Sequence, residues 1–254
     1  MSIEAALNSF AIRTFRDTAD YDYVSARMAW RARLVPQFHW AALQAIEKYL
    51  KCILMLNRVP RVKNDRLGHN LGKALVRVEA NLQFPLRLSK ESREFIVHLD
   101  KFGRFRYLEI SYYTRGAELI PLDRAVWELR RYCKPLTASV KLNDGSKRSL
   151  TPHLLKEIES AEVAPHSFRL IGGQLEKILT DQRHPAREAL VWRNMFFGSR
   201  KRSRVQIRTY SHSTNAPLSL DPDMLDEVIK YVEIPKDVEV AFRARMTGKS
   251  RSAP

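Results

Sequence analysis

The chain has 254 residues, with 44 Lys and Arg against 28 Asp and Glu, which gives a formal net charge of +16 and a pI near 10.1. With 44% hydrophobic residues it has enough length and apolar content to bury a core, which excludes wholesale disorder. Nine glycines and two cysteines exclude a collagen-like chain, a disulfide framework and a four-thiolate zinc site, and they argue against an all-β fold dense in turns.

The N-terminal sequence carries no export signal. The segment MSIEAALNSFAIRTFRD lacks a basic stretch followed by an apolar one. The most apolar window, residues 40–56, is interrupted by three charged residues, so it predicts a core helix and no membrane span. Cys52 and Cys133 lie on apolar helix faces and are expected to be inert core thiols. A reduced, cytoplasmic location is the simplest interpretation.

Helical periodicity dominates the first half of the chain. One helix is predicted over residues 19–34 and a second over 36–57, where apolar residues recur at steps of three and four. A third helix is predicted over 69–82. A fourth begins at the N-cap Ser89 and is expected to end at Gly103, a glycine just past the last turn.

A fifth helix is predicted after Pro121, and the turn sequence NDGSK at 143–147 is the predicted domain boundary. Beyond it, short helices are predicted over residues 152–161, 173–181, 186–197, 222–232 and 236–247, with a strand over 204–212 in nothing larger than a hairpin. The predicted fold is all-α: an up-and-down helical bundle over residues 1–142, a helical C-terminal extension over 151–254 docked on it, and a disordered tail over 248–254.

No metal or cofactor motif is present in the sequence. The seven histidines are scattered, without His-Glu-x-x-His or Cys-x-x-Cys spacing, so we predict no metal site. A glycine-rich dinucleotide loop and a Walker-type phosphate loop are also missing, so we predict no cofactor bound through these devices. No Gly-x-Ser-x-Gly nucleophile elbow occurs.

The excess positive charge is uneven. Residues 1–150 carry 27 Lys and Arg and 15 Asp and Glu, a net +12, whereas residues 151–254 carry a net +4. Two segments concentrate the cations: Arg58, Arg61, Lys63, Arg66, Lys73 and Arg77 in the first, and Arg200, Lys201, Arg202, Arg204 and Arg208 in the second. Such clusters favour a polyanionic partner, because neutralising phosphates releases condensed counterions. A solvated surface run is the alternative for either segment.

Several motifs follow one another in the order seen in a known family. They are DYDYVSAR at 20–27, QAIEKYLK at 44–51, GHNL at 68–71 and the pair Arg106-Tyr107. Together, over about residues 18–135, they resemble the HEPN superfamily. The resemblance implies a bundle of four or five helices that forms a homodimer. It also implies RNA or nucleotide as the ligand, either bound or cleaved without a metal, in toxin–antitoxin or defence systems.

Cleaving members of that superfamily pair an Arg with a His four to six residues later, contributed by two protomers. Arg93 with His98 fits this spacing, as do Arg33 with His39 and Arg148 with His153. The abundance of arginine alone predicts two or three such matches. At the position that the family uses, Arg106 is followed by no histidine at the required distance. This absence favours a non-catalytic protein, and Arg93 and His98 remain the catalytic candidates.

The predicted function is therefore binding of RNA or another phosphate-bearing ligand. The ligand-binding candidates are Arg61, Lys63, Arg66, His69, Arg104, Arg106 and Tyr107, and the phosphate-binding candidates are Arg200, Lys201 and Arg202. The plain alternative buries the tyrosine and pairs the arginines with nearby acids; Glu47 and Lys48 would likewise form solvated or intra-helical ion pairs. Two other functions stay open: a metal-independent endoribonuclease acting as a dimer, and a structural protein whose basic surface meets an acidic protein partner.

Overall fold

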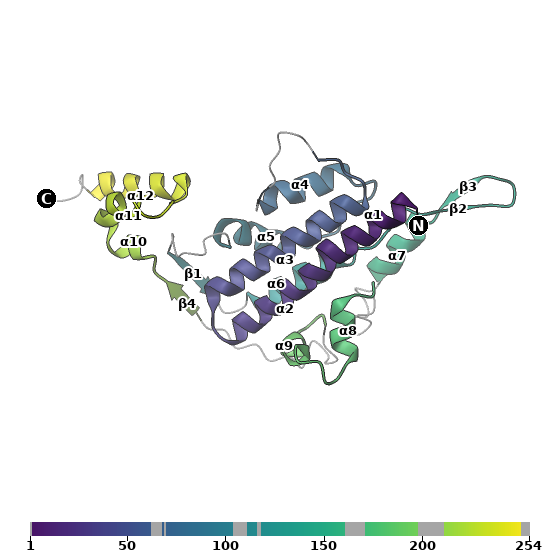
Figure 1. Cartoon of the computed structure of the whole chain (residues 1–254), viewed down its shortest axis with the longest axis horizontal. Helices are drawn as coiled ribbons and strands as arrows, with labels where there is room; N and C mark the ends of the chain where they lie inside the picture. Colours follow the sequence, from purple (N-terminus) through teal and green to yellow (C-terminus); the bar gives the residue numbers. More distant parts are fainter. Residues whose placement is uncertain are drawn as a thin grey trace. The chain divides into compact units, whose positions relative to one another are not determined.

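The computed structural model describes residues 2–61, 68, 70–103, 111–115, 118–160, 171–197 and 211–249. The chain divides into two compact units, each built from two stretches: the first unit from residues 1–104 and 118–207, the second from 105–117 and 208–254. Both are mostly helical (Figure 1), so the predicted all-α class is confirmed. In the part of the chain that is described, no helix is long and apolar enough to cross a membrane.

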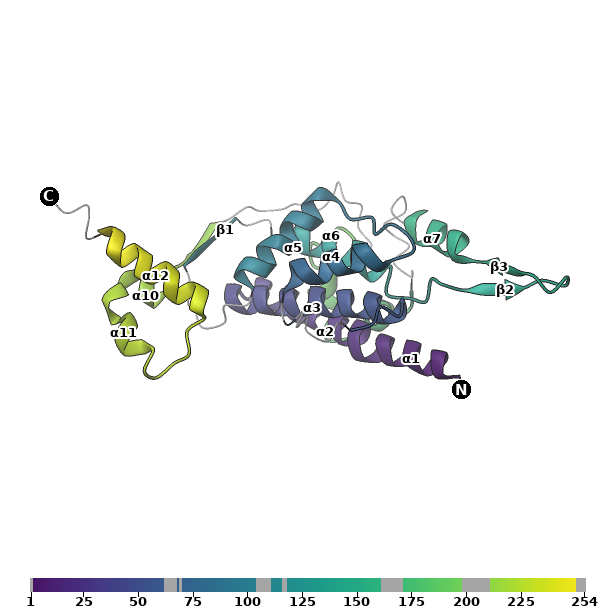
Figure 2. The same ribbon diagram turned by 90° about the horizontal axis from the view of Figure 1, so that it is seen from above.

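A central helix, α3 (Val35–Leu56), organises the first unit. Its buried residues cover more than half of the helix surface, and the less buried residues Trp40, Gln44, Lys48, Lys51 and Met55 recur along one face. It is contacted by α1 (Ile3–Ala11), α2 (Asp17–Arg31), α4 (Leu71–Asn81), α5 (Lys90–Phe102) and α6 (Leu119–Arg130). Figure 2 shows α3 between α1 and α2 on one side and α4, α5 and α6 on the other. The helix predicted over 36–57 is confirmed, with Pro36 in its first turn.

The N-terminal helix α1 was not predicted from the sequence. Its apolar side chains Ile3 and Phe10 are 82% and 52% exposed, so they do not mark a buried face. The helix begins at Ser2, whose hydroxyl accepts a hydrogen bond from the Ala5 N–H at 3.2 Å. A five-residue π-helical turn, Ile12–Arg16, continues it directly into α2.

The ends of α4 to α6 follow local capping rules. Asn70 and Ser89 are the N-caps of α4 and α5, each accepting a hydrogen bond from the N–H three residues later. Helix α6 begins at Leu119, ahead of Pro121, because a proline is tolerated within the first turn. Helix α5 ends at Gly103, as predicted, but the glycine is not in the left-handed region: its φ is −69°.

Glycine is needed at 103 for a different reason, which is close approach between helices. A Cβ there would lie 2.9 Å from the Leu43 Cβ and 3.0 Å from the His39 carbonyl oxygen. The end of α5 can therefore press against α3 only if this residue has no side chain.

Three further helices belong to the first unit: α7 (Thr151–Ser160), α8 (Gln174–Thr180) and α9 (Arg187–Val191). Ile158, Leu175 and Leu190 from these helices join the same hydrophobic core as α3. The structure thus divides the chain elsewhere than at the predicted boundary, 143–147, since apolar residues on both sides of that turn share one core.

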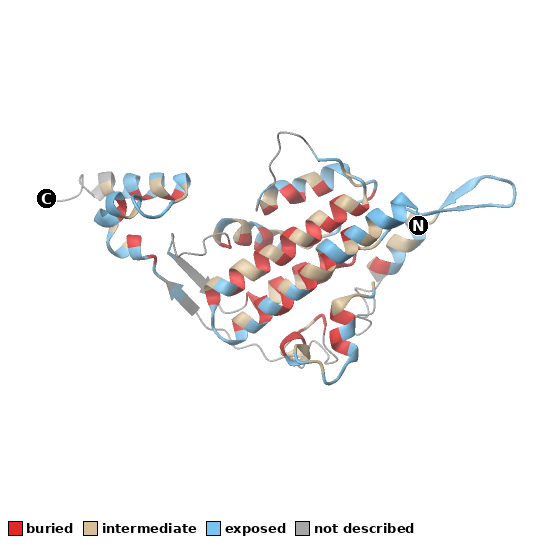
Figure 3. Cartoon of the chain, viewed as in Figure 1, coloured by how far each residue is buried: buried red, intermediate tan, exposed pale blue. Residues whose placement is uncertain are grey.

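Residues 142–146 instead form the turn of an exposed hairpin. Its strands are β2 (Ser139–Lys141) and β3 (Lys147–Ser149), paired antiparallel. Figure 3 shows the hairpin exposed along its whole length. Gly145 takes a φ of +81°, and the Asp144 carboxylate accepts a hydrogen bond from the Ser146 N–H at 2.8 Å.

Buried charges fasten α8 to the bundle. The Arg130 guanidinium contacts Asp20 at 2.7 Å and Glu176 at 2.5 Å, and these three side chains are all buried. The Tyr49 hydroxyl donates to the same Asp20 carboxylate at 2.7 Å, which also accepts from the N–H of Leu175 at the start of α8. Each buried charge therefore has partners, as its burial requires.

Helix α9 is shorter than the predicted 186–197. It ends at Val191, because Arg193 takes a left-handed backbone with φ of +50°. Asn194 then organises the following turn: its side-chain oxygen accepts from the N–H groups of Phe196 and Phe197 at 2.9 and 2.8 Å. An asparagine that satisfies backbone groups in this way competes with continuation of the helix.

The second unit combines a two-stranded sheet with short helices. Strand β1 (Tyr112–Arg115) pairs antiparallel with β4 (Ser211–Thr214), so the strand predicted within 204–212 pairs with a distant segment and not in a local hairpin; residues 204–210 lie outside the described ones. Its other elements are α10 (Pro217–Leu220), a 3-10 turn at Pro222–Met224, α11 (Leu225–Val228) and α12 (Lys236–Lys249). The helix predicted over 222–232 is thus two short pieces.

The disordered tail predicted over 248–254 is wrong at its first two residues. Residues 248 and 249 belong to α12, and 250–254 lie outside the described residues. A small core of Leu218, Leu225, Val238 and Phe242 holds α10, α11 and α12 together.

Candidate functional site

A pocket of about 710 Å³ lies at the C-terminal end of α3. Its lining combines apolar residues with four cations: Leu7, Phe15, Leu54, Met55, Val59 and Gly68, with Lys51, Arg58, Arg61 and Arg77. We call it the basic pocket. Among the described residues no carboxylate lines it. Apolar surface beside several cations suits an anion that also carries a flat apolar group.

Arg58 occupies an unusual backbone position in this pocket. Its φ is +56°, a left-handed conformation. The N–H of Arg58 bonds to the Met55 carbonyl and that of Val59 to the Leu54 carbonyl, the two hydrogen bonds of a Schellman cap. Glycine is the usual residue there, and a side chain costs about 1 kcal/mol or more. Arg58 thus occupies a backbone position that favours a glycine.

Among the described residues, Arg58 bonds only to neutral oxygens. Its guanidinium donates to the Asn8 side-chain oxygen at 2.7 Å and to the carbonyl oxygens of Met55, Glu4 and Leu56 at 2.8, 3.2 and 3.4 Å. Lys51 differs, because it forms an ion pair with Glu47, one turn earlier on α3. Unlike Lys51, Arg58 makes no ion pair with a described carboxylate, so its charge can meet an anion.

One of the predicted binding residues lies in the basic pocket. Arg61 lines it, together with Arg58 and Arg77 from the same cationic segment of the sequence. The other candidates lie outside the described residues: Lys63, Arg66, His69, Arg104, Arg106, Tyr107, Arg200, Lys201 and Arg202.

The two catalytic candidates on α5 contact different groups. The Arg93 guanidinium lies 2.5 Å from the Glu79 carboxylate on α4, whereas the His98 Nε2 lies 3.2 Å from the Glu118 Oε1. A separation of five residues places them about 140° apart around the helix axis. Within one chain, Arg93 and His98 therefore do not converge on a common point.

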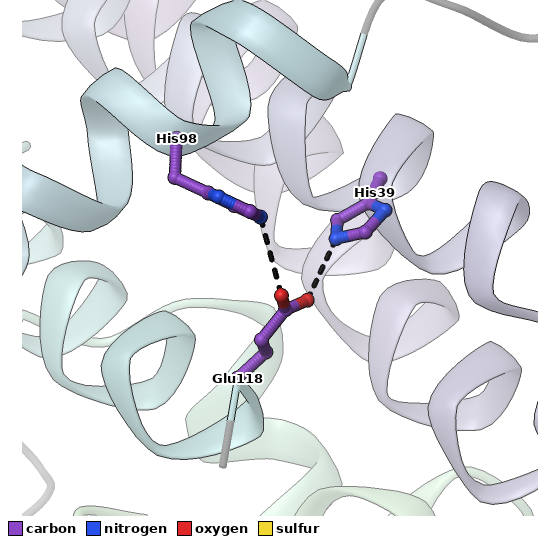
Figure 4. A group of neighbouring side chains, drawn as sticks. All are labelled: His39, His98 and Glu118. Carbon is purple, nitrogen blue, oxygen red and sulfur yellow. Dashed lines mark hydrogen bonds and ion pairs between the residues drawn. The ribbon is translucent and has the colours of Figure 1, made fainter. Parts of the chain in front are cut away.

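His98 belongs instead to a cluster of three side chains from three segments (Figure 4). His39 comes from α3, His98 from α5, and Glu118 directly precedes α6. The His39 Nε2 lies 2.6 Å from the Glu118 Oε2, while His98 faces the other carboxylate oxygen. One potential ligand atom from each residue lies within 4.8 Å of the other two. We call this the His-Glu-His cluster.

The cluster is nearly enclosed by protein. The side chains of His39, Glu118 and His98 are 2%, 10% and 27% exposed. Burial by itself would raise the pKa of Glu118, but its close contacts with the two imidazoles outweigh burial and hold that pKa below its usual value. Glu118 is therefore an ionised carboxylate at neutral pH.

The motifs DYDYVSAR at 20–27 and QAIEKYLK at 44–51 contribute mainly to the stability of the fold. From DYDYVSAR, Asp20 and Arg27 are buried ion-pair partners, and Lys48 of QAIEKYLK pairs with Asp22. The Glu47–Lys51 contact is the intra-helical ion pair expected as the plain alternative.

By its spacing in the sequence His39 pairs only with Arg33, and Glu118 belongs to no sequence motif. No spacing rule links the members of the His-Glu-His cluster, because His98 follows His39 by 59 residues and Glu118 follows His98 by 20. Arg58 was recognised as part of a cationic segment, without its left-handed backbone. No protein-family model, curated protein or solved structure matches this chain.

Proposed function

We propose that this chain is a HEPN-like protein that binds RNA, or another ligand bearing phosphate and an aromatic base, in its basic pocket without cleaving it. The observation that carries the proposal is the composition of that pocket: four cations beside apolar side chains, with no described carboxylate in the lining. Guanidinium groups bind phosphate, and apolar or aromatic side chains accept the face of a base.

The hydrogen bonds of Arg58 support the same proposal. Its described acceptors are neutral oxygens, which hold the guanidinium in the pocket lining without neutralising its charge. The net charge of +16 adds long-range attraction for a polyanion. Within this proposal the protein acts as a homodimer in a toxin–antitoxin or defence system, as the superfamily resemblance implies.

The sharpest test compares two arginines with the same backbone but different surroundings. Arg33 has a φ of +60° and closes α2 with the same pair of Schellman hydrogen bonds, to Trp30 and Ala29, yet it does not line the pocket. Arg58→Gly and Arg33→Gly remove equal charge and relieve equal strain. Arg33→Gly is expected to unfold at the same or a higher urea concentration than the wild type. Arg58→Gly also loses its hydrogen bonds to Asn8 and Glu4 on α1, so it should unfold at a slightly lower concentration than Arg33→Gly.

RNA affinity should separate the two variants. Measured by fluorescence anisotropy with a labelled single-stranded RNA oligonucleotide, Arg58→Gly should bind about tenfold more weakly, the effect of losing one charged hydrogen bond. The slope of log affinity against log salt should become shallower by about 0.7 for the lost phosphate contact. Arg33→Gly should stay near the wild type. Equal affinities for the two variants would place the binding site elsewhere, and an affinity independent of salt would refute phosphate recognition.

The endoribonuclease alternative requires Arg93 and His98 to meet across two protomers. Incubating RNA with the wild type and with His98→Ala, in the presence of EDTA, tests it directly. Degradation by the wild type alone would favour the nuclease, and intact RNA in both samples would favour binding without cleavage.

A further inference from the structure

The His-Glu-His cluster lies far from the basic pocket. His39 and Arg58 are at opposite ends of α3, separated by about 28 Å along the helix axis at 1.5 Å per residue. A function of the cluster is therefore independent of whether the pocket binds RNA.

From this convergence of donors we propose that His39, His98 and Glu118 form a binding site for one divalent transition-metal ion, with Zn²⁺ as the best match. Two imidazole nitrogens and one carboxylate oxygen are a known donor set for zinc and for non-haem iron, and three protein ligands leave coordination positions for water. Spacing rules missed the site because they detect ligands that share one helix or loop, and here each ligand comes from a different segment.

The donor atoms point at one another. Both imidazoles present Nε2 toward the same carboxylate, one at each of its oxygens (Figure 4). The His98 Nε2 is buried and makes no well-directed hydrogen bond, although Glu118 Oε1 is only 3.2 Å away. A metal ion between the nitrogens and the carboxylate would use this nitrogen as a ligand and would need only small rotations of the side chains.

Neighbouring aromatic rings limit the freedom of His98. Phe102 packs against its ring with centroids 4.8 Å apart, and Phe95 stacks at 6.1 Å. Gly103, at the end of α5, lies directly against the His39 carbonyl group of α3, so the two helices that carry the histidines are close together. Ligands fixed in this way lose little freedom on binding an ion, which favours affinity.

Access and charge are also suitable. The His98 side chain is the most exposed of the three, so an ion and its water ligands can enter past it. Glu118 adds a carboxylate to the two imidazoles, the type of ligand that supplies negative charge to a buried dication.

The test is metal binding by the full chain after treatment with EDTA and removal of the chelator. Titration with Co²⁺ should produce visible absorption bands of a low-coordinate site that saturate at one equivalent, and Zn²⁺ should displace them. His98→Ala should weaken Co²⁺ binding by more than about 100-fold, because loss of a ligand exceeds the 10–100-fold effect of losing its supporting contacts. His153→Ala, at an exposed histidine on α7, is the matched control and should bind like the wild type.

Thermal unfolding provides a second measurement that does not depend on the spectrum. Excess Zn²⁺ should raise the melting temperature of the wild type and of His153→Ala, but not that of His98→Ala or Glu118→Gln, because only the folded site binds the ion. If the wild type shows no saturable binding, or if His98→Ala and the wild type titrate alike, the cluster is a structural hydrogen-bonded group and the metal site is refuted. Neither outcome depends on RNA binding.

Discussion

Charged side chains in the core of the first unit are stabilised as pairs. Arg27 and Asp123 form an ion pair in which the side chains are 0% and 1% exposed. The Tyr23 hydroxyl donates to the same carboxylate at 2.7 Å, and Arg27 also donates to the Ala189 carbonyl at 2.9 Å. Arg27 thus connects α2 to α6 and to α9, and its partners compensate for the loss of water.

Breaking this pair should destabilise the protein more than replacing it. Arg27→Met or Asp123→Leu alone should lower the free energy of unfolding by about 3–5 kcal/mol, because each leaves a buried charge without its partner. The double variant should recover a large part of that loss. Urea denaturation with all three variants completes the thermodynamic cycle.

The exposed pair Lys90–Glu94 on α5 serves as the comparison. Its atoms lie 3.8 Å apart and its side chains are 86% and 65% exposed. Removing either partner should change the free energy of unfolding by no more than about 0.5 kcal/mol. If Arg27→Met had an equally small effect, the buried network would not hold α9 in place.

At the scale of elements, the approach of α5 to α3 depends on one missing side chain. Gly103→Ala would place a Cβ 2.8 Å from the Leu99 carbonyl oxygen and against Leu43. Backbone atoms on both sides cannot move easily, so the variant should lose about 1–3 kcal/mol of unfolding free energy in urea.

Gly72→Ala, in the first turn of α4, is the matched control. Its Cβ would meet only side-chain oxygens, those of Asp100 at 3.3 Å and Asn70 at 3.6 Å. The higher helix propensity of alanine offsets that contact, so the change should stay below about 1 kcal/mol. A Gly103→Ala protein as stable as Gly72→Ala would contradict the close approach of α5 and α3.

At the scale of the whole molecule, two separate cores predict two separate responses to mutation. The core of the second unit shares no residue with that of the first. Phe242→Ala removes a buried ring from the small core, which should open α10, α11 and α12 locally. Hydrogen exchange of amides in α12 should accelerate, while that of amides in α3 should not change.

Val240→Ala, on the same helix but 66% exposed, is the control and should leave exchange in both units as in the wild type. Faster exchange in α3 of Phe242→Ala would mean that the two units unfold together, against their separate cores.

Most helices were predictable because their signals lie within a few residues. The steps of three and four in α3, the N-caps Asn70 and Ser89, and Pro36 in a first turn are all local features. Helix α1 was missed although it carries local signals, the N-cap Ser2 and apolar residues at 3, 7, 10 and 11, because this apolar face is short and mostly exposed. The early end of α9 was missed since it depends on how Asn194 bonds to the backbone.

The amino-acid sequence alone was sufficient for the all-α class and for locating a cationic segment beside the end of α3. Periodicity and charge clustering act between near neighbours, and a single chain displays them directly. The pairing of β1 with β4, the partner of each buried arginine, and the meeting of His39, His98 and Glu118 required the folded molecule. These contacts join residues 20 to about 100 positions apart, and the packing of helices and strands, which no local pattern encodes, brings them together.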